Sequence, residues 1–254
     1  MAVQSIPVEN QPFLYVNGLV VSNNATTPNT KVNLSAGQAR DSSDSMDIVL
    51  SAAVVIDTAV IGDPNGLDQG VLLASKVYAI YVIGDSTNKK QPAGLISLAS
   101  NSTPLMPFGY DSYRLVGYAV SDSSVHFLKA YISGNNNFRR FVYDAPLATS
   151  VTAGTSATYA AIDLSVLVPA VDQTPVIFRA NWTANAAADT FNMQGGNGTG
   201  DQWTLIAPVA GATAHTVGFG SVLSQLVATV PTSNYKVSGV GGVAINVAAF
   251  EFFI

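Results

Sequence analysis

Short blocks of apolar residues, some continuous and some alternating with polar residues, recur along most of the chain, and both patterns predict β-strands. The clearest block is Val77–Ile83, which is almost uninterrupted between Lys76 and Gly84 and is typical of a strand buried on both faces. Val243–Phe253 alternates, with an irregularity expected at Ala248–Ala249. Gly, Asn, Ser and Pro clusters separate the segments. Further strands are expected at 47–56, 95–98, 113–120, 125–132, 138–143, 162–168, 176–182, 190–193, 203–206, 226–230 and 235–237.

The N-terminal region has its own pattern. Phe13–Val21 predicts two strands joined at Asn17–Gly18, because Asn-Gly between apolar residues favours a two-residue hairpin. The first twelve residues hold two prolines and no clear period, which fits either an extended arm that orders on a neighbouring subunit or a frayed terminus. We therefore interpret residues 1–32 as an anchoring arm and hairpin.

The remaining strands suggest two domains. Residues 149–157 carry no charge and one large apolar side chain, Val151, so they are interpreted as a linker. Strands every 8–12 residues with polar turns are typical of β-sandwiches and jelly rolls. We expect an all-β protein with one antiparallel, jelly-roll-like sandwich at 33–148 and a second at 158–254. Helices are expected only as single turns, one of them near Gly220–Leu226.

Composition narrows the class of protein. The chain has 254 residues and 26.4 kDa, with 48% hydrophobic and 11% charged residues, less than half the usual charged fraction of about 25%. Such an apolar chain is expected to fold rather than stay disordered. Net charge −5 disfavours nucleic-acid binding. The longest apolar stretch, Leu50–Gly62, is interrupted by Asp57 and falls short of the ~18 residues of a membrane span. The chain has no cysteine, and its first residues do not resemble a secretion signal.

The low charge also suggests how the surface is used. Glutamate occurs only at positions 9 and 251, while short hydroxyl and amide side chains are common. Such a surface can be buried without stranding unpaired ions, which would cost several kcal/mol each. The composition favours a permanent assembly subunit over a freely diffusing monomer, although a monomeric β-domain with the same surface stays open.

No catalytic motif stands out. The two histidines, His126 in an expected strand and His215 near a strand end, accompany no Gly-x-Ser-x-Gly elbow, so structural or surface roles are expected. Gly195–Gly200 is glycine-rich, but a strand-like segment follows it where a phosphate loop needs a helix, which favours a hairpin tip. No residue is assigned to catalysis, cofactor binding or a metal, and no cofactor is expected.

Two acidic loops each allow two interpretations. Residues 41–47 place aspartates three apart, and residues 62–68 hold Asp63 and Asp68. Both can be read as turn-forming aspartates or as a metal-ion site, although the first lacks the alternating pattern and closing Glu of an EF-hand. A carboxylate pair for glycoside hydrolysis cannot be picked from the sequence. Trp182, Trp203 and the ten tyrosines could stack on sugars or serve the core or an interface.

Several of these segments, taken in order, resemble a family of tailed-bacteriophage virion proteins of the tail-fibre, head-fibre and head–tail-junction kind. The resemblance covers most of residues 33–254 and consists of turn and strand patterns, at 39–41, 56–58, 65–68, 77–81, 84–86, 91–95, 113–119, 121–124, 164–169, 178–182, 231–233, 235–237 and 243–253. It implies β-sandwich domains, a homo-oligomer with three subunits expected, and a structural role on the particle. Residues 1–32 lie outside it.

We therefore expect a non-enzymatic structural protein of the virion, a fibre or collar-type component at the head–tail junction or tail. Its expected partners are further copies of itself and, through the N-terminal arm, other virion proteins. One alternative is a capsid decoration protein that cements the head. Another is a carbohydrate-binding module that recognises a host surface glycan.

Overall fold

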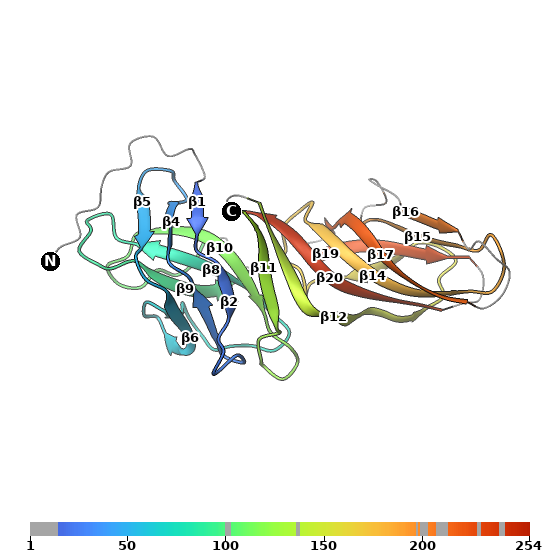
Figure 1. The fold of residues 1–254 in the computed structure, drawn as a ribbon, viewed down its shortest axis with the longest axis horizontal. Helices are drawn as coiled ribbons and strands as arrows, with labels where there is room; N and C mark the ends of the chain where they lie inside the picture. Colours follow the sequence, from blue (N-terminus) through green and yellow to red (C-terminus); the bar gives the residue numbers. More distant parts are fainter. Residues whose placement is uncertain are drawn as a thin grey trace.

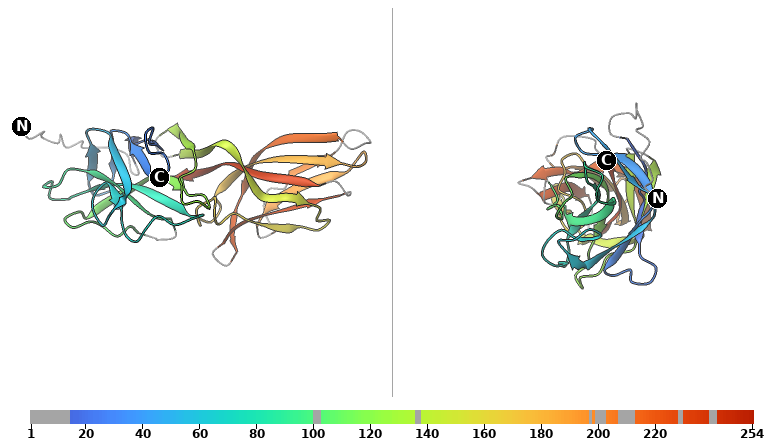
Figure 2. Two further views of the ribbon diagram at one scale, coloured as in Figure 1. Left: turned by 90° about the horizontal axis from the view of Figure 1, so that it is seen from below. Right: turned by 90° about the vertical axis from the view of Figure 1, so that its left-hand side faces the viewer.

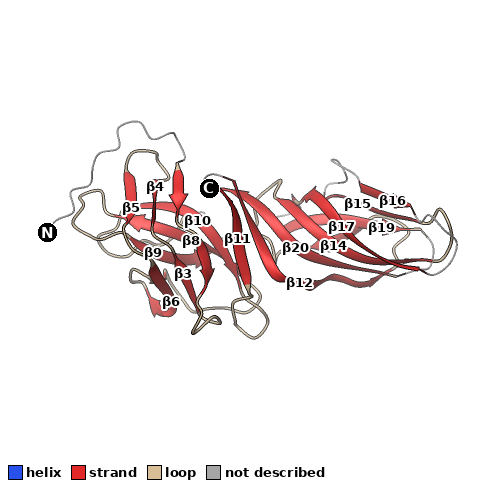
Figure 3. Ribbon diagram, in the orientation of Figure 1, coloured by secondary structure: helices blue, strands red, loops and turns tan. Residues whose placement is uncertain are grey.

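The computed structural model describes residues 15–99, 103–135, 138–196, 198, 203–206, 213–227, 230–238 and 242–254. These residues form β-strands and no helix, so the all-β prediction is confirmed (Figure 3). None of the described segments is a helix that could cross a membrane. Two lobes lie end to end, the first drawn in blue to green and the second mainly in yellow to red (Figures 1 and 2). We call residues 15–143 the first lobe and residues 144–249 the second lobe.

The described residues form three sheets. A small sheet has the order β1-β4-β5, from β1 (Val16–Gly18), β4 (Gly37–Arg40) and β5 (Asp47–Leu50). The largest sheet contains, in chain order, β2 (Val21–Asn23), β3 (Lys31–Leu34), β6 (Val54–Ile61), β7 (Gly66–Leu67), β8 (Val77–Gly84), β9 (Ala93–Leu98), β10 (Ser112–Val120), β11 (Ala130–Asn135), β12 (Phe138–Gly154), β14 (Pro175–Ala184), β17 (Thr213–Leu223) and β20 (Val243–Phe253). The third sheet contains β13 (Ala160–Asp163), β15 (Thr190–Gly195), β16 (Trp203–Ile206) and β19 (Val230–Val237), with β18 (Gln225–Val227) paired to β19.

The largest sheet runs through both lobes, in the order β10-β8-β9-β7-β6-β3-β2-β11-β12-β20-β14-β17. Its strands are antiparallel except where the short β7 pairs with β6 and β9. Every residue of β8 is buried, as its continuous apolar run predicts. The small sheet contributes to this burial, because a Cβ at Gly84 would lie 3.2 Å from the Ile48 side chain.

The strand at the edge of the largest sheet, β10, closes the first lobe. Gly117 of β10 faces Val21 of β2 so closely that a Cβ there would lie 2.9 Å from Val21 Cγ2. The ring of Tyr118, also in β10, lies 5.7 Å from that of Phe250 and 4.9 Å from that of Phe252, both in β20. The sheet therefore curls until β10, the first strand in its order, meets β2 and β20, which stand seventh and tenth. The C-terminal residues consequently belong to the core of the first lobe (Figure 1).

The predicted hairpin at Asn17–Gly18 is wrong. β1 pairs with β4 and β2 pairs with β3, so the two strands lie in different sheets. Between them, Gly18 and Leu19 have φ values of +67° and +52°. Leu19 is fully buried, and its backbone N–H donates to the Ala36 carbonyl oxygen at 3.2 Å. Burial of Leu19 between the sheets thus replaces the local turn that the Asn-Gly pair favours.

The predicted linker is also wrong over residues 149–154, which belong to β12. This strand leaves the first lobe and continues along β20, with Val151 opposite Ile245 and Gly154 opposite Val243 (Figure 1). Gly154 lies against Tyr235 of β19, where a Cβ would be 2.5 Å from the phenol oxygen. The glycine at position 154 permits this close approach of β12 and β19. The boundaries of the two predicted domains stay a prediction.

In the second lobe β14 packs against the third sheet, where the ring centroids of Trp182 in β14 and Phe191 in β15 are 6.3 Å apart. The expected irregularity in β20 is confirmed, because the pairing on both sides jumps from Ala249 to Val247. The single helical turn expected near 220–226 is wrong, because β17 and β18 occupy it. The strand expected at 125–132 is also wrong over residues 125–129, because β11 begins at Ala130. Val125 adopts a φ of +64° in a turn there.

Candidate functional site

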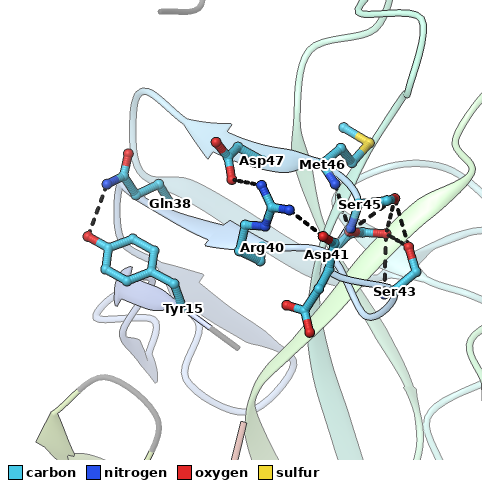
Figure 4. Close-up of polar contacts among 9 residues, drawn as sticks. Tyr15, Gln38, Arg40, Asp41, Ser43, Ser45, Met46 and Asp47 are labelled. Carbon is cyan, nitrogen blue, oxygen red and sulfur yellow. Dashed lines mark hydrogen bonds and ion pairs between the residues drawn. The ribbon is translucent and has the colours of Figure 1, made fainter. Parts of the chain in front are cut away.

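The acidic segment 41–47 forms the connection between β4 and β5 (Figure 4). Asp41 is 5% exposed, and its carboxylate accepts the backbone N–H groups of Ser45 at 2.7 Å and Met46 at 3.0 Å. The hydroxyls of Ser43 and Ser45 donate to the same carboxylate. Burial alone would raise the pKa of Asp41, but the hydrogen bonds from Ser43, Met46 and Ser45 outweigh it and lower the pKa. Asp41 therefore organises the loop.

The other aspartates of this segment do not converge on Asp41. Asp47 binds the Arg40 guanidinium at 3.2 Å, and the same guanidinium donates to the Asp44 carbonyl oxygen (Figure 4). Arg114 of β10 is also close: burial lowers its pKa, and the charges of Asp44 and Asp41 act in the opposite direction. Two arginines thus balance the acidic loop. In the described part of the chain, no group of three or more His, Cys, Asp or Glu side chains could hold a metal ion.

The second acidic loop, 62–68, is built in the same way. Asp68 is 2% exposed and accepts the Ser97 hydroxyl at 2.7 Å and the backbone N–H of Leu105 at 3.1 Å. Asn65, with a φ of +62°, exchanges hydrogen bonds with Gly94. Asp63 is exposed. The structure favours the interpretation of both loops as turns held by carboxylates.

The remaining residues singled out in the sequence lie apart from one another. His126 is exposed in a turn, where its backbone N–H donates to Asp122 at 2.9 Å. His215 lies in β17 opposite Trp182. The Gly195–Gly200 segment follows β15 and leads to its antiparallel partner β16, as a hairpin tip does, although positions 197, 199 and 200 lie outside the described residues. Trp182 is buried, while Trp203 is 39% exposed.

A surface pocket that the sequence did not reveal lies beside Tyr131. Its volume is about 440 Å³, and it is lined by the β2–β3 turn together with Lys129, Tyr131 and Asp144. The Tyr131 side chain is 53% exposed. The pocket offers an aromatic ring, an ammonium and a carboxylate, a combination suited to a small polar ligand with one apolar face. The pairing of β11 with β2 helps to bring these segments together.

Arg139 is the second feature missed in the sequence. It is 3% exposed, and its guanidinium donates to the carbonyl oxygens of Leu19 at 2.7 Å, Val116 at 2.8 Å and Gly18 at 2.6 Å. Val116 lies at a bulge in β10, where the regular pairing with β8 is interrupted. Burial lowers the pKa of Arg139 to about 10. This side chain therefore ties the β1–β2 connection to the bulge in β10.

The comparisons with known proteins give no family. No model of a known protein family and no curated protein matches the chain. The site must therefore be judged from its geometry.

Proposed function

We propose that the chain is a non-enzymatic structural subunit of a bacteriophage virion, a fibre or collar-type component at the head–tail junction or tail. In this proposal it works as a homo-oligomer, with three copies expected, and each lobe is a jelly-roll-like sandwich. The N-terminal residues attach it to other virion proteins.

One observation carries this proposal: large apolar side chains stay on the surface of a chain with few charges. Phe108 is 95% exposed, Phe253 72%, Ile206 64%, Val71 63% and Leu105 57%. They occur on both lobes, and three ion pairs are found among the described side chains. Covering such a surface with further subunits gains about 25 cal/mol per Å² of apolar area and strands little charge.

A carbohydrate-binding role in host recognition is a second candidate, and the Tyr131 pocket favours it. Its exposed ring could stack on one face of a sugar while Lys129 and Asp144 bind hydroxyls. A glycan array with the wild-type chain and a Tyr131→Ala variant tests this candidate. Glycan binding that the variant loses would favour it, and an array without signal would contradict it.

The proposal as a virion subunit is tested on purified particles. Quantitative peptide mass spectrometry should find this chain at a few copies to tens of copies per particle, and antibody labelling should place it at the tail or the head–tail junction. Hundreds of copies spread over the head would replace the fibre or collar role by capsid decoration. Particles that lack the chain would contradict the proposal altogether.

A further inference from the structure

The outer face of β11, β12 and β20 in the first lobe carries exposed aromatic rings. These three strands pair side by side (Figure 1). In β12, Arg139 and Phe141 are 3% and 2% exposed, so their side chains belong to the core. Because successive side chains of a strand point to opposite faces, Phe138, Arg140 and Val142 lie on the outer face.

The register of the strands places further aromatic residues on this outer face. Tyr131 of β11 lies opposite Val142, and Phe253 of β20 lies opposite Phe138. Tyr131 is 53% exposed, Phe138 38% and Phe253 72%. The ring centroids of Phe138 and Phe253 are 5.2 Å apart in an edge-to-face contact. Val142 follows Phe138 by four residues, so at ~3.3 Å per residue about 13 Å of strand separates Tyr131 from the two phenylalanines.

Polar side chains lie between and beside the rings. The Arg140 guanidinium donates to the Glu251 carboxylate at 3.0 Å, and Ser133 lies opposite Arg140 in β11. At the other end, Lys129 and Asp144 line the Tyr131 pocket, and the backbone N–H of Asp144 donates to the Lys129 carbonyl oxygen at 3.0 Å. Each positive group is thus matched by a negative group on the next strand. We call the three rings with these polar side chains the aromatic face.

This arrangement favours a sugar chain over a protein as the ligand. Hot spots between proteins cluster near the centre of an interface, whereas these rings lie at two separate places with hydroxyl and charged groups between them. A sugar ring can stack one apolar face on an aromatic side chain while its hydroxyls bind polar groups at its edge. The distance from Tyr131 to Phe138 is longer than one sugar ring, so a ligand that reaches both must be a chain.

We propose that the aromatic face binds a neutral oligosaccharide, with one sugar stacked on Tyr131 and a later sugar of the same chain on Phe138 and Phe253. The polar side chains between the rings bind hydroxyls of the intervening sugars. Because the charges of the face balance, a chain with an acidic group on its sugars gains no net attraction. This inference rests on the carbohydrate-binding candidate and names the length and charge of its ligand. It assigns Phe253 to the glycan and leaves the other exposed apolar side chains to contacts between subunits.

A glycan array tests both the length and the charge. It carries neutral gluco-, manno- and galacto-oligosaccharides together with uronic-acid and sialic-acid oligosaccharides, each as the single sugar and as chains of increasing length. The wild type should bind long neutral chains and should bind single sugars much more weakly. F253A should raise the dissociation constant for the long chains at least ~10-fold and leave the weak binding of single sugars unchanged.

F108A is the matched control, because Phe108 is 95% exposed but lies in the connection between β9 and β10. It should leave glycan binding unchanged. Circular dichroism melts verify that each variant is folded, and multi-angle light scattering measures whether each variant keeps the mass of the wild type.

The other outcomes overturn the inference in distinguishable ways. Binding that Tyr131→Ala removes, but that neither chain length nor F253A affects, would confine the site to the Tyr131 pocket and leave the carbohydrate candidate standing. A preference for the acidic chains would overturn the neutral class. A smaller mass for F253A with unchanged glycan binding would assign Phe253 to a contact between copies. An array without signal would contradict both the inference and the candidate on which it rests.

Discussion

The two lobes hold their loops and edges with different chemistry. In the first lobe, the carboxylates of Asp41, Asp68 and Asp85 accept groups of hydrogen bonds from neighbouring loops. In the second lobe, Thr204 donates to the Asn192 side chain at 2.7 Å, and Thr190 N–H donates to Ser238 at 2.6 Å. Carboxylates also accept backbone N–H groups there, at exposed turns. The stability of the first lobe should therefore depend on ionised groups more than that of the second.

The largest effect is expected where β20 reaches the core of the first lobe. Phe250 of β20 is fully buried, stacks on Phe141 at 5.0 Å and meets Tyr118 at 5.7 Å. Phe250→Ala leaves a cavity at this junction and should cost about 3–5 kcal/mol of unfolding free energy. Urea denaturation measures the loss. Phe253→Ala is the control, since this ring is 72% exposed, and it should cost less than about 1 kcal/mol. Equal losses would contradict the burial of Phe250 in this core.

Two neighbouring arginines provide the next contrast. Arg139→Met keeps much of the side-chain volume but removes the donors to Gly18, Leu19 and Val116, so about 3 kcal/mol should be lost. Arg140 instead pairs with Glu251 at the surface, and Arg140→Met should cost at most about 1 kcal/mol. Urea midpoints of the two variants make the comparison. A loss for Arg139→Met no greater than for Arg140→Met would show that Arg139 does not secure β10 and the β1–β2 connection.

Acid should lower the stability of the first lobe more than that of the second. The pKa of Asp85 is lowered to about 2, by the hydroxyl and N–H of Thr87 first, and those of Asp41 and Asp57 are also lowered. A carboxylate with a lower pKa in the folded state binds fewer protons there than in the unfolded state, where its pKa is about 3.9. Its contribution to stability is therefore present above about pH 4 and is lost as the pH falls toward 2.

Hydrogen exchange with peptide-level mass analysis can follow this loss in each lobe. Between pH 5 and about pH 2.5, amides of the β4–β5 and β8–β9 loops should lose protection before those of β15 and β19, after correction for the intrinsic exchange rate. Asp85→Asn should weaken the acid dependence of the β8–β9 loop. Simultaneous loss of protection in both lobes would contradict the difference between them.

The smallest effect is expected in the second lobe. Thr204→Val removes the hydroxyl that binds Asn192, whose side chain is mostly buried, and should cost about 1 kcal/mol. Because both groups are neutral, the cost should be the same at pH 7 and pH 3. Thermal melts at the two pH values measure it. A cost that changes with pH would show that ionised groups also control this sheet.

The sequence predicted those features that depend on local pattern. The all-β class, the doubly buried strand at Val77–Ile83 and the irregularity near Ala248 follow from the order of apolar residues, and the structure confirms them. Asn17–Gly18 was misleading, because the burial of Leu19 between two sheets overrides the turn preference. The strand through 149–154 was missed because its backbone pairs with β20, a segment about ninety positions away in the sequence.

The sites were harder to predict, since they depend on contacts between distant segments. Turn-forming aspartates could be foreseen, but their burial could not, because Asp68 meets Ser97 only after the strands have paired. The Tyr131 pocket needs β11 beside β2, and Arg139 contacts residues more than a hundred positions away. Nothing in the local sequence distinguishes Arg139 from Arg140. The exposed Phe108 likewise has no sequence signature, because apolar residues in loops can be buried or exposed.

Sedimentation velocity on the purified full chain at micromolar concentration tests most directly whether further copies of the chain cover its ion-poor surface. The account predicts a species whose mass is a multiple of 26.4 kDa, with three copies expected. A single species of 26.4 kDa at every concentration would contradict it.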